Sequence, residues 1–499
     1  MKKYIAIMFA AALAAVSCNL DQTPYSETVA ADYVKGDASV NNLLIGAYNG
    51  LYDVMYYEWA MTELRSDNVR MRVNQSSSGD TKLVEQLDQN VVQTANDWVE
   101  KYWNASYKVI YRANSVLANI DKVKNGTKRA QYEGEALFLM AWMHFNLVRL
   151  WGPCFKVTRS IPADEARHMQ RSTVDEVYDL IEEDLGRIIS EKLLPAKMSD
   201  DELGRADIKA AEAMLAKVYM TRWQPGDEGY AEAIPLLEAV MDSCSTGGIP
   251  TLIPYADVFD KAKECNSEIL LAVRYKSGSL GIGSPFTTLF APINNAGNVA
   301  MGSPKHFNFP SDNLIAAYAQ GDLRKDVTLQ ESYYNATTGQ IIDGASGRYC
   351  SKFIDKDMSS EWDAENDWPV IRLADVMLLY SEAYNEINGP GTKALECLNA
   401  VRTRAGLDPY DAAALGTRFA FRTAVRNERR LELAMENQRW FDLLRWENAV
   451  ATVNAFYTSE IFYSGYNYTV NPIEKWQTLL PVPTAVLNIN KDVAQNPGY

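Results

Sequence analysis

Apolar residues recur at spacings of three and four over long stretches of the chain, and no other feature constrains the fold as strongly. The stretch 97–123 opens with an Asn96-Asp97 cap and keeps this spacing to its end. The stretch 132–152 is apolar nearly all round and stops at Gly152-Pro153, which is typical of a buried helix. Together these patterns predict a mainly α-helical protein.

Two pairs of predicted helices share one internal order. Residues 216–241 and 381–402 each contain a helix that ends near a tyrosine, then a Pro-Gly turn, then a helix that begins with alanines. This order resembles degenerate tetratricopeptide units, which are paired helices of about 34 residues. Such units stack into a superhelical scaffold, which is the architecture we expect. Scaffolds of this kind mostly bind partners.

The composition changes between residues 245 and 370. This part is rich in Gly, Ser, Pro and Asn and contains little β structure beyond short runs such as residues 268–275. Long irregular segments inside a compact protein are usually functional. We therefore divide the chain into a signal peptide at 1–17, a tether at 18–35, an N-terminal helical region at 36–244, an irregular loop-rich insert at 245–370, and a C-terminal helical region with its tail at 371–499.

The first residues have the form of a secretory signal. Lys2 and Lys3 precede an apolar run from Ile5 to Val16, which is too short to span a bilayer as a helix. The run ends at Ala15-Val16-Ser17-Cys18, and small residues before a cysteine resemble a bacterial lipobox. Cys18 would then be acylated and become the mature N-terminus. The alternative is a plain signal peptide with an incidental cysteine.

The composition also argues against several classes of partner and site. A net charge of −15 repels phosphate backbones, so we expect no nucleic acid partner. The five cysteines after Cys18 are widely spaced and form neither a disulfide framework nor a zinc ribbon. The three histidines make no HExxH motif, and no GxSxG motif or phosphate-binding loop occurs. We therefore expect no metal, no cofactor and no catalytic residues.

The stretch RNERRLELAMENQRWFDLLRW, residues 426–446, packs many charges among leucines and tryptophans. Glu428 and Glu432 lie one helical turn apart between arginines, so they are either a catalytic pair or part of a scaffold. Arginines lower the pKa of neighbouring carboxyl groups, whereas a general acid needs a raised pKa. We predict one helix over 421–446 whose charges pair at spacings of three and four and dock it onto its neighbours.

Seven segments of the chain, in the same order, resemble the SusD/RagB family of surface nutrient-binding lipoproteins. The most specific of them is ERRLELAMENQRWFDLLRW. The matching segments are residues 63–69, 103–117, 135–152, 204–220, 368–389, 398–407 and 428–446.

This resemblance implies a fold of about four tetratricopeptide-like helix pairs that support a variable loop region. It implies a lipid-anchored protein on the outer face of the outer membrane of Bacteroidota, held through Cys18. Such a protein lies as a lid over a TonB-dependent, SusC-like barrel and delivers oligosaccharides to it. Members bind their ligands and do not cleave them, so we expect no enzyme. The alternatives are the same fold carrying peptides, a glycoside hydrolase, and a pure scaffold.

Candidate ligand contacts follow from the chemistry of sugars, whose apolar faces stack on flat rings and whose hydroxyls bond Asp, Asn or Arg. Two regions of the sequence offer that mixture, and in the family such sites tend to lie between an early loop and the insert. The early region offers Trp59, Asp67, Asn68 and Arg72, with Tyr56 and Tyr57 behind them. The insert offers Phe286, Phe290, Asn294, Asn295, Phe307, Trp362 and Trp368, of which we expect Trp368 to be core.

Overall fold

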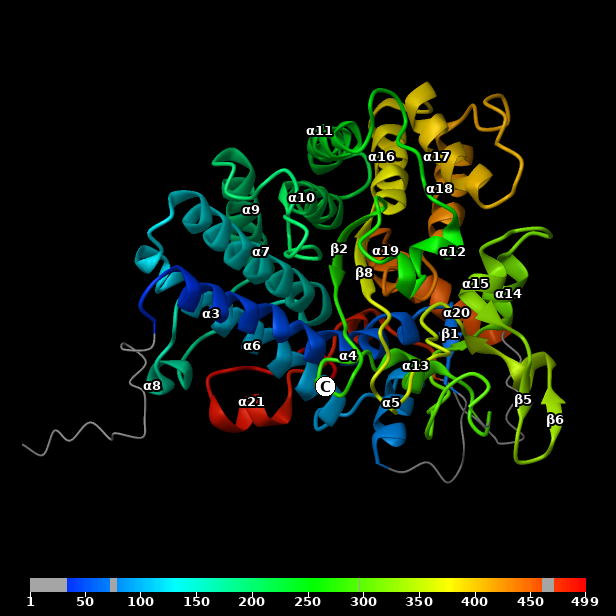
Figure 1. The fold of residues 1–499 in the computed structure, drawn as a ribbon, viewed down its shortest axis with the longest axis horizontal. Helices are drawn as coiled ribbons and strands as arrows, with labels where there is room; N and C mark the ends of the chain where they lie inside the picture. The colour runs from blue at the N-terminus through cyan, green and yellow to red at the C-terminus, as the bar shows by residue number, and fades with distance from the viewer. Residues whose placement is uncertain (1–33, 72–78, 296, 460–470) are drawn as a thin grey trace, which may run out of the picture.

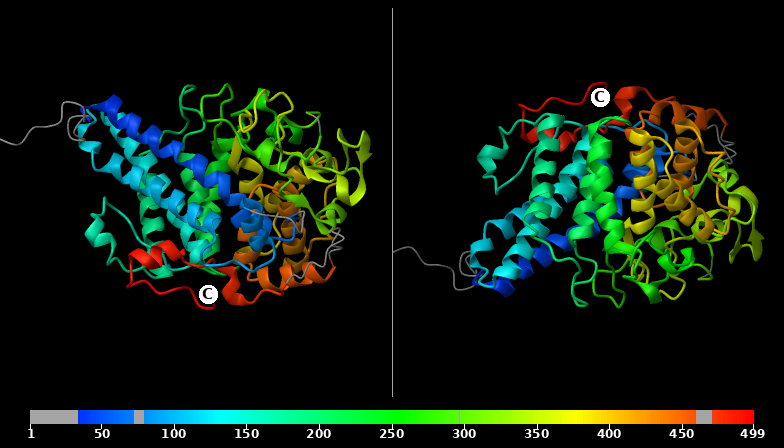
Figure 2. Two further views of the ribbon diagram at one scale, coloured as in Figure 1. Left: turned by 90° about the horizontal axis from the view of Figure 1, so that it is seen from below. Right: turned by 90° about the horizontal axis from the view of Figure 1, so that it is seen from above.

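A row of packed helices makes up most of the computed structural model, which describes residues 34–71, 79–295, 297–459 and 471–499 (Figure 1). Neighbouring helices of the row pack in turn, and Figure 2 shows them following one another from cyan through green to yellow and orange. The mainly α, tetratricopeptide-like fold is thus confirmed. The row consists of α3 (Asp37–Asn49), α6 (Asp97–Leu117), α7 (Gly126–Trp151), α9 (Val174–Ser190), α10 (Ile208–Arg222), α11 (Glu228–Ser243), α16 (Leu373–Asn388), α17 (Thr392–Arg404) and α18 (Arg418–Glu432).

Shorter elements complete the chain. The remaining helices are α4 (Leu51–Met61), α5 (Asp80–Asp88), α8 (Ala163–Ala166), α12 (Tyr255–Val258), α13 (Phe286–Phe290), α14 (Asp312–Ala317), α15 (Lys325–Thr328), α19 (Arg439–Arg445), α20 (Ala449–Ser459) and α21 (Thr484–Ile489). The strands are β1 (Val69–Arg70), β2 (Ile269–Val273), β3 (Phe309–Pro310), β4 (Leu329–Gln330), β5 (Tyr333–Asn335), β6 (Gln340–Ile342), β7 (Tyr349–Cys350) and β8 (Trp368–Arg372).

Local sequence signals set the ends of the central helices. The Asn96 side chain accepts hydrogen bonds from the backbone N–H groups of Trp98 and Val99, at 3.0 and 3.2 Å, so it caps the start of α6 as predicted. Helix α7 ends where Gly152 adopts a φ of 69°. It is buried on nearly all sides by other helices. Among the residues that the structure describes, no helix has the length and apolarity needed to cross a bilayer.

The two ends of the loop-rich insert are tied together. The predicted β run near 268–275 is observed as β2, which pairs antiparallel with β8. Trp368 in β8 is 1% exposed and stacks on Phe353 with ring centroids 4.1 Å apart, so its predicted place in the core is confirmed. The insert therefore leaves and rejoins the helical row at adjacent points, which fixes it against the row.

The prediction of one helix over 421–446 is wrong. Helix α18 ends at Glu432 and α19 begins at Arg439, with Met435 and Asn437 at φ values of 69° and 62° between them. The break lets the Glu436 carboxylate accept hydrogen bonds from Arg372, at 2.7 Å, and from Lys352, at 2.8 Å. A continuous helix would direct Glu436 elsewhere, so these buried ion pairs override helix propensity.

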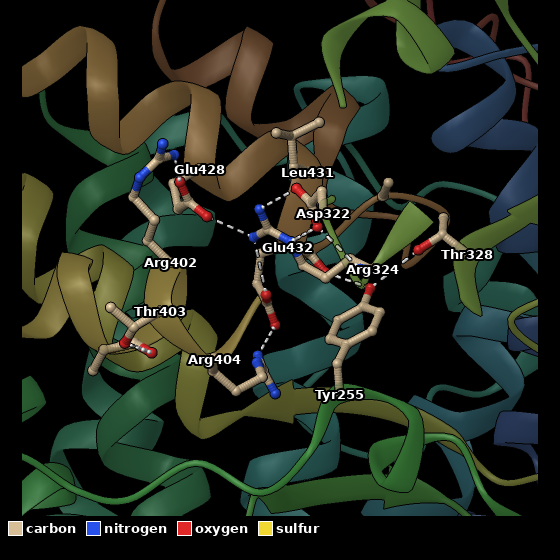
Figure 3. Close-up of polar contacts among 12 residues, drawn as sticks. Tyr255, Asp322, Arg324, Thr328, Arg402, Thr403, Arg404, Glu428, Leu431 and Glu432 are labelled. Atoms are coloured by element: carbon tan, nitrogen blue, oxygen red, sulfur yellow. Dashed lines mark hydrogen bonds and ion pairs between the residues drawn. The ribbon is translucent and has the colours of Figure 1, made fainter. Parts of the chain in front are cut away.

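Ion pairs between distant segments hold α18 in place (Figure 3). The Glu432 carboxylate lies 2.9 Å from the Arg372 guanidinium, 3.3 Å from that of Arg324 and 2.5 Å from that of Arg404. Glu428 lies 2.6 Å from Arg324. These partners come from the insert, β8 and α17 rather than from the same helix, so the prediction of pairs within one helix is wrong for the two glutamates. A pair at a spacing of three does form between Asp442 and Arg445, at 2.9 Å.

The electrostatic environment of the two glutamates differs. Burial raises the pKa of Glu432, but Arg404, Arg372 and Arg324 outweigh it and lower that pKa to about 2. For Glu428, burial outweighs the attraction of Arg324 and its pKa is raised, which contradicts the prediction for this residue. Neither carboxyl is exposed, and neither lines a described pocket. The pair is part of a scaffold.

Replacing Arg372 by Met should lower the free energy of unfolding by about 3–5 kcal/mol. The reason is that the buried carboxylates of Glu268, Glu432 and Glu436 lose a shared partner. Urea unfolding followed by circular dichroism measures this change. The matched control is Arg159→Met, which breaks an exposed pair with Glu165 and should cost at most about 1 kcal/mol. Equal losses in the two variants would contradict a structural role for the network.

A buried histidine predicts how stability depends on pH. His144 Nε2 accepts from the Val157 N–H at 3.3 Å, so Nδ1–H donates to the Met140 carbonyl at 2.8 Å and the ring is neutral. Burial lowers the pKa of His144 to about 4. The unfolded chain, with an ordinary histidine pKa near 6.5, therefore takes up a proton first, and stability is lost as pH falls from about 6.5 to 4.

Between pH 7 and 5 the protein should lose about 1–2 kcal/mol of stability through this residue. The loss should be absent in His144→Gln and retained in His168→Gln, since His168 is exposed. Urea midpoints at the two pH values give the comparison. A pH slope in His144→Gln equal to that of the unmutated protein would show that His144 does not cause it.

Candidate functional site

A pocket of about 270 Å³ lies where the early helices meet the insert. Both regions that the sequence offered for ligand binding contribute to it. We call it the aromatic pocket. Its lining residues are Tyr56, Asp80, Thr81, Trp98, Leu289, Lys305, Phe307 and Trp362.

One wall of the aromatic pocket comes from α4 and the start of α6. The Asn96 cap fixes the first turn of α6 and thereby the position of Trp98. The Trp98 ring is buried, and the partly buried Tyr56 ring packs against it with centroids 5.7 Å apart. Burial raises the pKa of Tyr56 to about 12, so its phenol stays protonated at neutral pH and can both donate and accept a hydrogen bond.

The insert contributes Trp362 to the aromatic pocket, and the backbone conformation of this residue is unusual. Its φ is 64°, in the left-handed region that bulky residues rarely adopt. The Trp362 N–H donates to Thr288 Oγ1 at 3.1 Å, and the nearby backbone pair between Ser284 and Ala364 fixes the segment. Its partly buried ring packs against that of Tyr56, with the ring centroids 6.3 Å apart. Strain of this kind is concentrated at functional sites.

Charged groups sit at the rim between the aromatic walls. Asp80 lies in the first turn of α5, and the Lys305 Nζ is 5.7 Å from the centre of the Trp362 ring. The Lys305 main chain is held because its N–H donates to the Thr288 carbonyl at 2.9 Å. One carboxylate and one ammonium beside flat rings suit a ligand with an apolar face and hydroxyl edges.

Three predicted contact residues lie beneath the aromatic pocket instead of lining it. Trp59, Phe286 and Phe290 are fully buried. Trp59 stacks on Phe307 at 5.6 Å and meets the edge of Phe290 at 5.5 Å, while Phe286 packs on Trp368 at 4.3 Å. Aromatic residues in these packed helices fill the core, so we withdraw these three as ligand contacts.

Asp67 and Asn68 are also buried, and their polar groups are already bonded. Asp67 makes two hydrogen bonds to Arg439, at 2.7 and 2.9 Å, and Asn68 Oδ1 accepts from Arg430 Nε at 2.9 Å. They connect the early segment to the C-terminal helices and are structural. Arg72 lies outside the described residues.

Among the other candidate contacts, Phe307 and Trp362 line the aromatic pocket, and Asn294 is exposed on the insert. Asn295 is buried, and its side chain accepts from the N–H groups of Val299 and Ala300. Sequence reasoning placed Tyr56 only in a supporting role. It missed five lining residues, which are Asp80, Thr81, Trp98, Leu289 and Lys305.

A second pocket of about 370 Å³ lies between residues 197–209, the end of α11 and β2. Its lining contains no aromatic side chain, so it lacks the flat ring on which a sugar stacks. Across the described part of the chain, no three His, Cys, Asp or Glu side chains are grouped so as to hold a metal ion. The aromatic pocket is therefore the better candidate site.

Comparisons with known proteins identify the family. A family model described as "SusD family" matches residues 293–499, and one described as "Starch-binding associating with outer membrane" matches residues 19–220. The chain belongs to the SusD/RagB family. Among SusD/RagB relatives, SusD-like protein P25 of Formosa agariphila is 27% identical over 96% of both chains.

Solved SusD-like structures show the same fold. A "Laminarin binding SusD-like protein" superposes with a TM-score of 0.75 at 24% identity, covering 93% of this chain and 100% of the other. Surface glycan-binding protein A from Bacteroides thetaiotaomicron, in complex with laminarihexaose, superposes with a TM-score of 0.75 at 20% identity, covering 92% and 99%. At these identities the likeness establishes the fold of this SusD/RagB member.

Proposed function

We propose that this protein captures a glycan in the aromatic pocket and does not cleave it. The observation that carries the proposal is the aromatic surface that Tyr56 and Trp362 form together in the pocket, with Asp80 and Lys305 beside it. A pyranose ring that enters the pocket stacks on this surface and offers its hydroxyls to the charged groups. The volume of about 270 Å³ is near the lower end for ligand pockets, which suits one or two sugar rings.

The carboxyl groups of the aromatic pocket support the proposal of binding without turnover. Glycoside hydrolysis generally needs two carboxyl groups on opposite sides of the scissile bond. Asp80 is the single carboxyl group among the described residues that line this pocket. Glu428 and Glu432, the pair that stands out in the sequence, are buried in ion pairs and cannot reach it.

The class of ligand we propose is a neutral oligosaccharide or polysaccharide. The rim supplies one negative and one positive group, and the chain as a whole carries a charge of −15, which disfavours polyanions. Laminarin and laminarihexaose are the ligands named for two structural relatives, which makes them the first glycans to test.

Replacing Trp362 by Ala should weaken glycan binding about tenfold or more, because it removes one stacking wall. Isothermal titration of laminarin and a panel of neutral polysaccharides measures the dissociation constant. The matched control is Trp223→Ala, an exposed tryptophan at the end of α10, which should bind as the unmutated protein does. Unchanged affinity in Trp362→Ala, or release of new reducing ends by the pure protein, would contradict the proposal.

We also propose that acylated Cys18 anchors the protein at the cell surface, over a SusC-like, TonB-dependent barrel that takes up the glycan. The lipobox-like sequence and the outer-membrane description of the matching family model support this. Cys18 itself lies outside the described residues.

Cys18→Ala should move the protein from the membrane fraction to the soluble fraction, because one lipid-bearing residue is removed while the folded part is unchanged. Fractionation followed by immunoblotting measures this, with intact-mass analysis for the acyl chains. Cys244→Ala, which changes a cysteine in the folded part, is the control and should stay membrane-bound. Membrane retention of Cys18→Ala would disprove the anchor.

A further inference from the structure

One short helix, α13, holds the pocket residues that the insert supplies. The described residues of the insert that line the aromatic pocket are Leu289, Lys305, Phe307 and Trp362, and Leu289 lies in α13 itself. The Lys305 N–H donates to the Thr288 carbonyl at 2.9 Å, and the Phe307 N–H donates to the Leu289 carbonyl at 2.8 Å. The Trp362 N–H donates to Thr288 Oγ1 at 3.1 Å. Helix α13 is therefore the frame on which this half of the pocket is built.

These hydrogen bonds differ in how much they depend on the sequence of α13. Backbone carbonyls hold Lys305 and Phe307, and the last turn of a helix offers such carbonyls whatever its side chains are. Trp362 is held by the Thr288 side chain instead. Thr288 is 0% exposed, so bulk water does not reach its hydroxyl. A substitution that removes this hydroxyl therefore alters the support of Trp362 and leaves that of Lys305 in place.

The bond from Trp362 to Thr288 matters because the Trp362 backbone is strained. Its φ of 64° is unfavourable for a bulky residue and persists only where the surrounding contacts impose it. The torsion φ is the rotation about N–Cα, so a bond that fixes the N–H direction fixes one side of this torsion. On the other side, Ser284 and Ala364 exchange backbone hydrogen bonds of 2.7 and 3.2 Å. Together these bonds set the direction in which the Trp362 side chain leaves the backbone.

Removal of the Thr288 hydroxyl takes away one of these two supports. In Thr288→Val, a methyl group of similar size faces the Trp362 N–H, which is left buried without this acceptor. The backbone avoids that cost by relaxing toward a negative φ, and such a rotation moves the indole ring out of its contact with Tyr56. The apparent dissociation constant of a ligand rises as the fraction of molecules with the ring in place falls.

We propose that Thr288 is a positioning residue of the glycan site, which holds the Trp362 ring in the orientation that contacts the sugar. This inference rests on the proposed function. Thr288 lies in the core and does not line the aromatic pocket. Its hydroxyl acts through Trp362, so its effect on glycan affinity does not exceed that of losing the Trp362 ring.

The test uses isothermal titration with laminarin, or with the tightest-bound neutral polysaccharide of the panel. Thr288→Val should weaken binding about tenfold, whereas Thr288→Ser, which keeps the hydroxyl, should bind within about twofold of the unmutated protein. The double variant of Thr288→Val with Trp362→Ala should bind as Trp362→Ala alone does, because two changes that act through one group are not additive.

The matched control is Thr287→Val, at the neighbouring position of α13. Thr287 is also 0% exposed. Its hydroxyl donates to the Phe353 carbonyl and accepts from the Asp355 N–H, both at 2.9 Å, and neither partner lines the aromatic pocket. Thr287→Val should therefore lower the free energy of unfolding at least as much as Thr288→Val does, and leave glycan affinity unchanged.

Hydrogen exchange at the Trp362 amide gives a second readout, which needs no ligand. This amide should exchange faster in Thr288→Val than in the unmutated protein, in Thr288→Ser or in Thr287→Val, because only Thr288→Val removes its acceptor. Equal exchange in all four proteins would show that the hydroxyl does not hold Trp362.

The binding results separate this inference from the proposed function. Unchanged affinity in Thr288→Val, together with weakened binding in Trp362→Ala, would overturn the positioning role and leave the proposed function standing. Equal weakening in Thr287→Val, or a double variant that binds more weakly than Trp362→Ala, would replace that role with a general loosening of α13. Failure of the unmutated protein to bind any neutral glycan would overturn the proposed function, and the role of Thr288 in binding with it.

Discussion

The architecture depends on buried carboxylates that are shared between guanidinium groups from distant parts of the chain. Glu432 alone joins the insert, β8 and α17 through Arg324, Arg372 and Arg404. A buried ion pair stabilises the fold little more than an apolar pair would. Leaving one of its charges without a partner, however, lowers the free energy of unfolding strongly. Such a network therefore favours the one arrangement of segments in which every charge is paired. Here it fixes the position of the irregular insert, which has few long strands or helices of its own to do so.

The position of the aromatic pocket follows from that arrangement. The β2–β8 pair and the ion pairs to α18 hold the insert against the early helices, and the aromatic pocket forms at this junction. Its walls come from opposite sides of the junction, with Tyr56 on α4 and Trp362 on the insert. The early helices thus supply one half of the aromatic pocket, and the insert supplies the other half.

The sequence predicted the repeated, regular part of the protein well and the site only in part. Helical periodicity and the Asn96 cap located α6, because these signals are local. The break between α18 and α19 was missed because it depends on the ion pair between Glu436 and Arg372, which is distant in the sequence. Trp59 and Trp362 have the same side chain, and only the packing shows that the first is buried and the second faces a pocket. Asp80 and Lys305 belong to no sequence motif, so only the structure shows that they lie at the same pocket.

A crystal structure of the protein in complex with a neutral oligosaccharide tests the central claim most directly. That claim is that the fold brings two aromatic rings from separate segments together as a surface for a sugar ring. The account predicts density for an intact sugar stacked on Tyr56 or Trp362 in the pocket, with hydroxyls near Asp80 and Lys305. An oligosaccharide found elsewhere on the surface, with the aromatic pocket left empty, would contradict it.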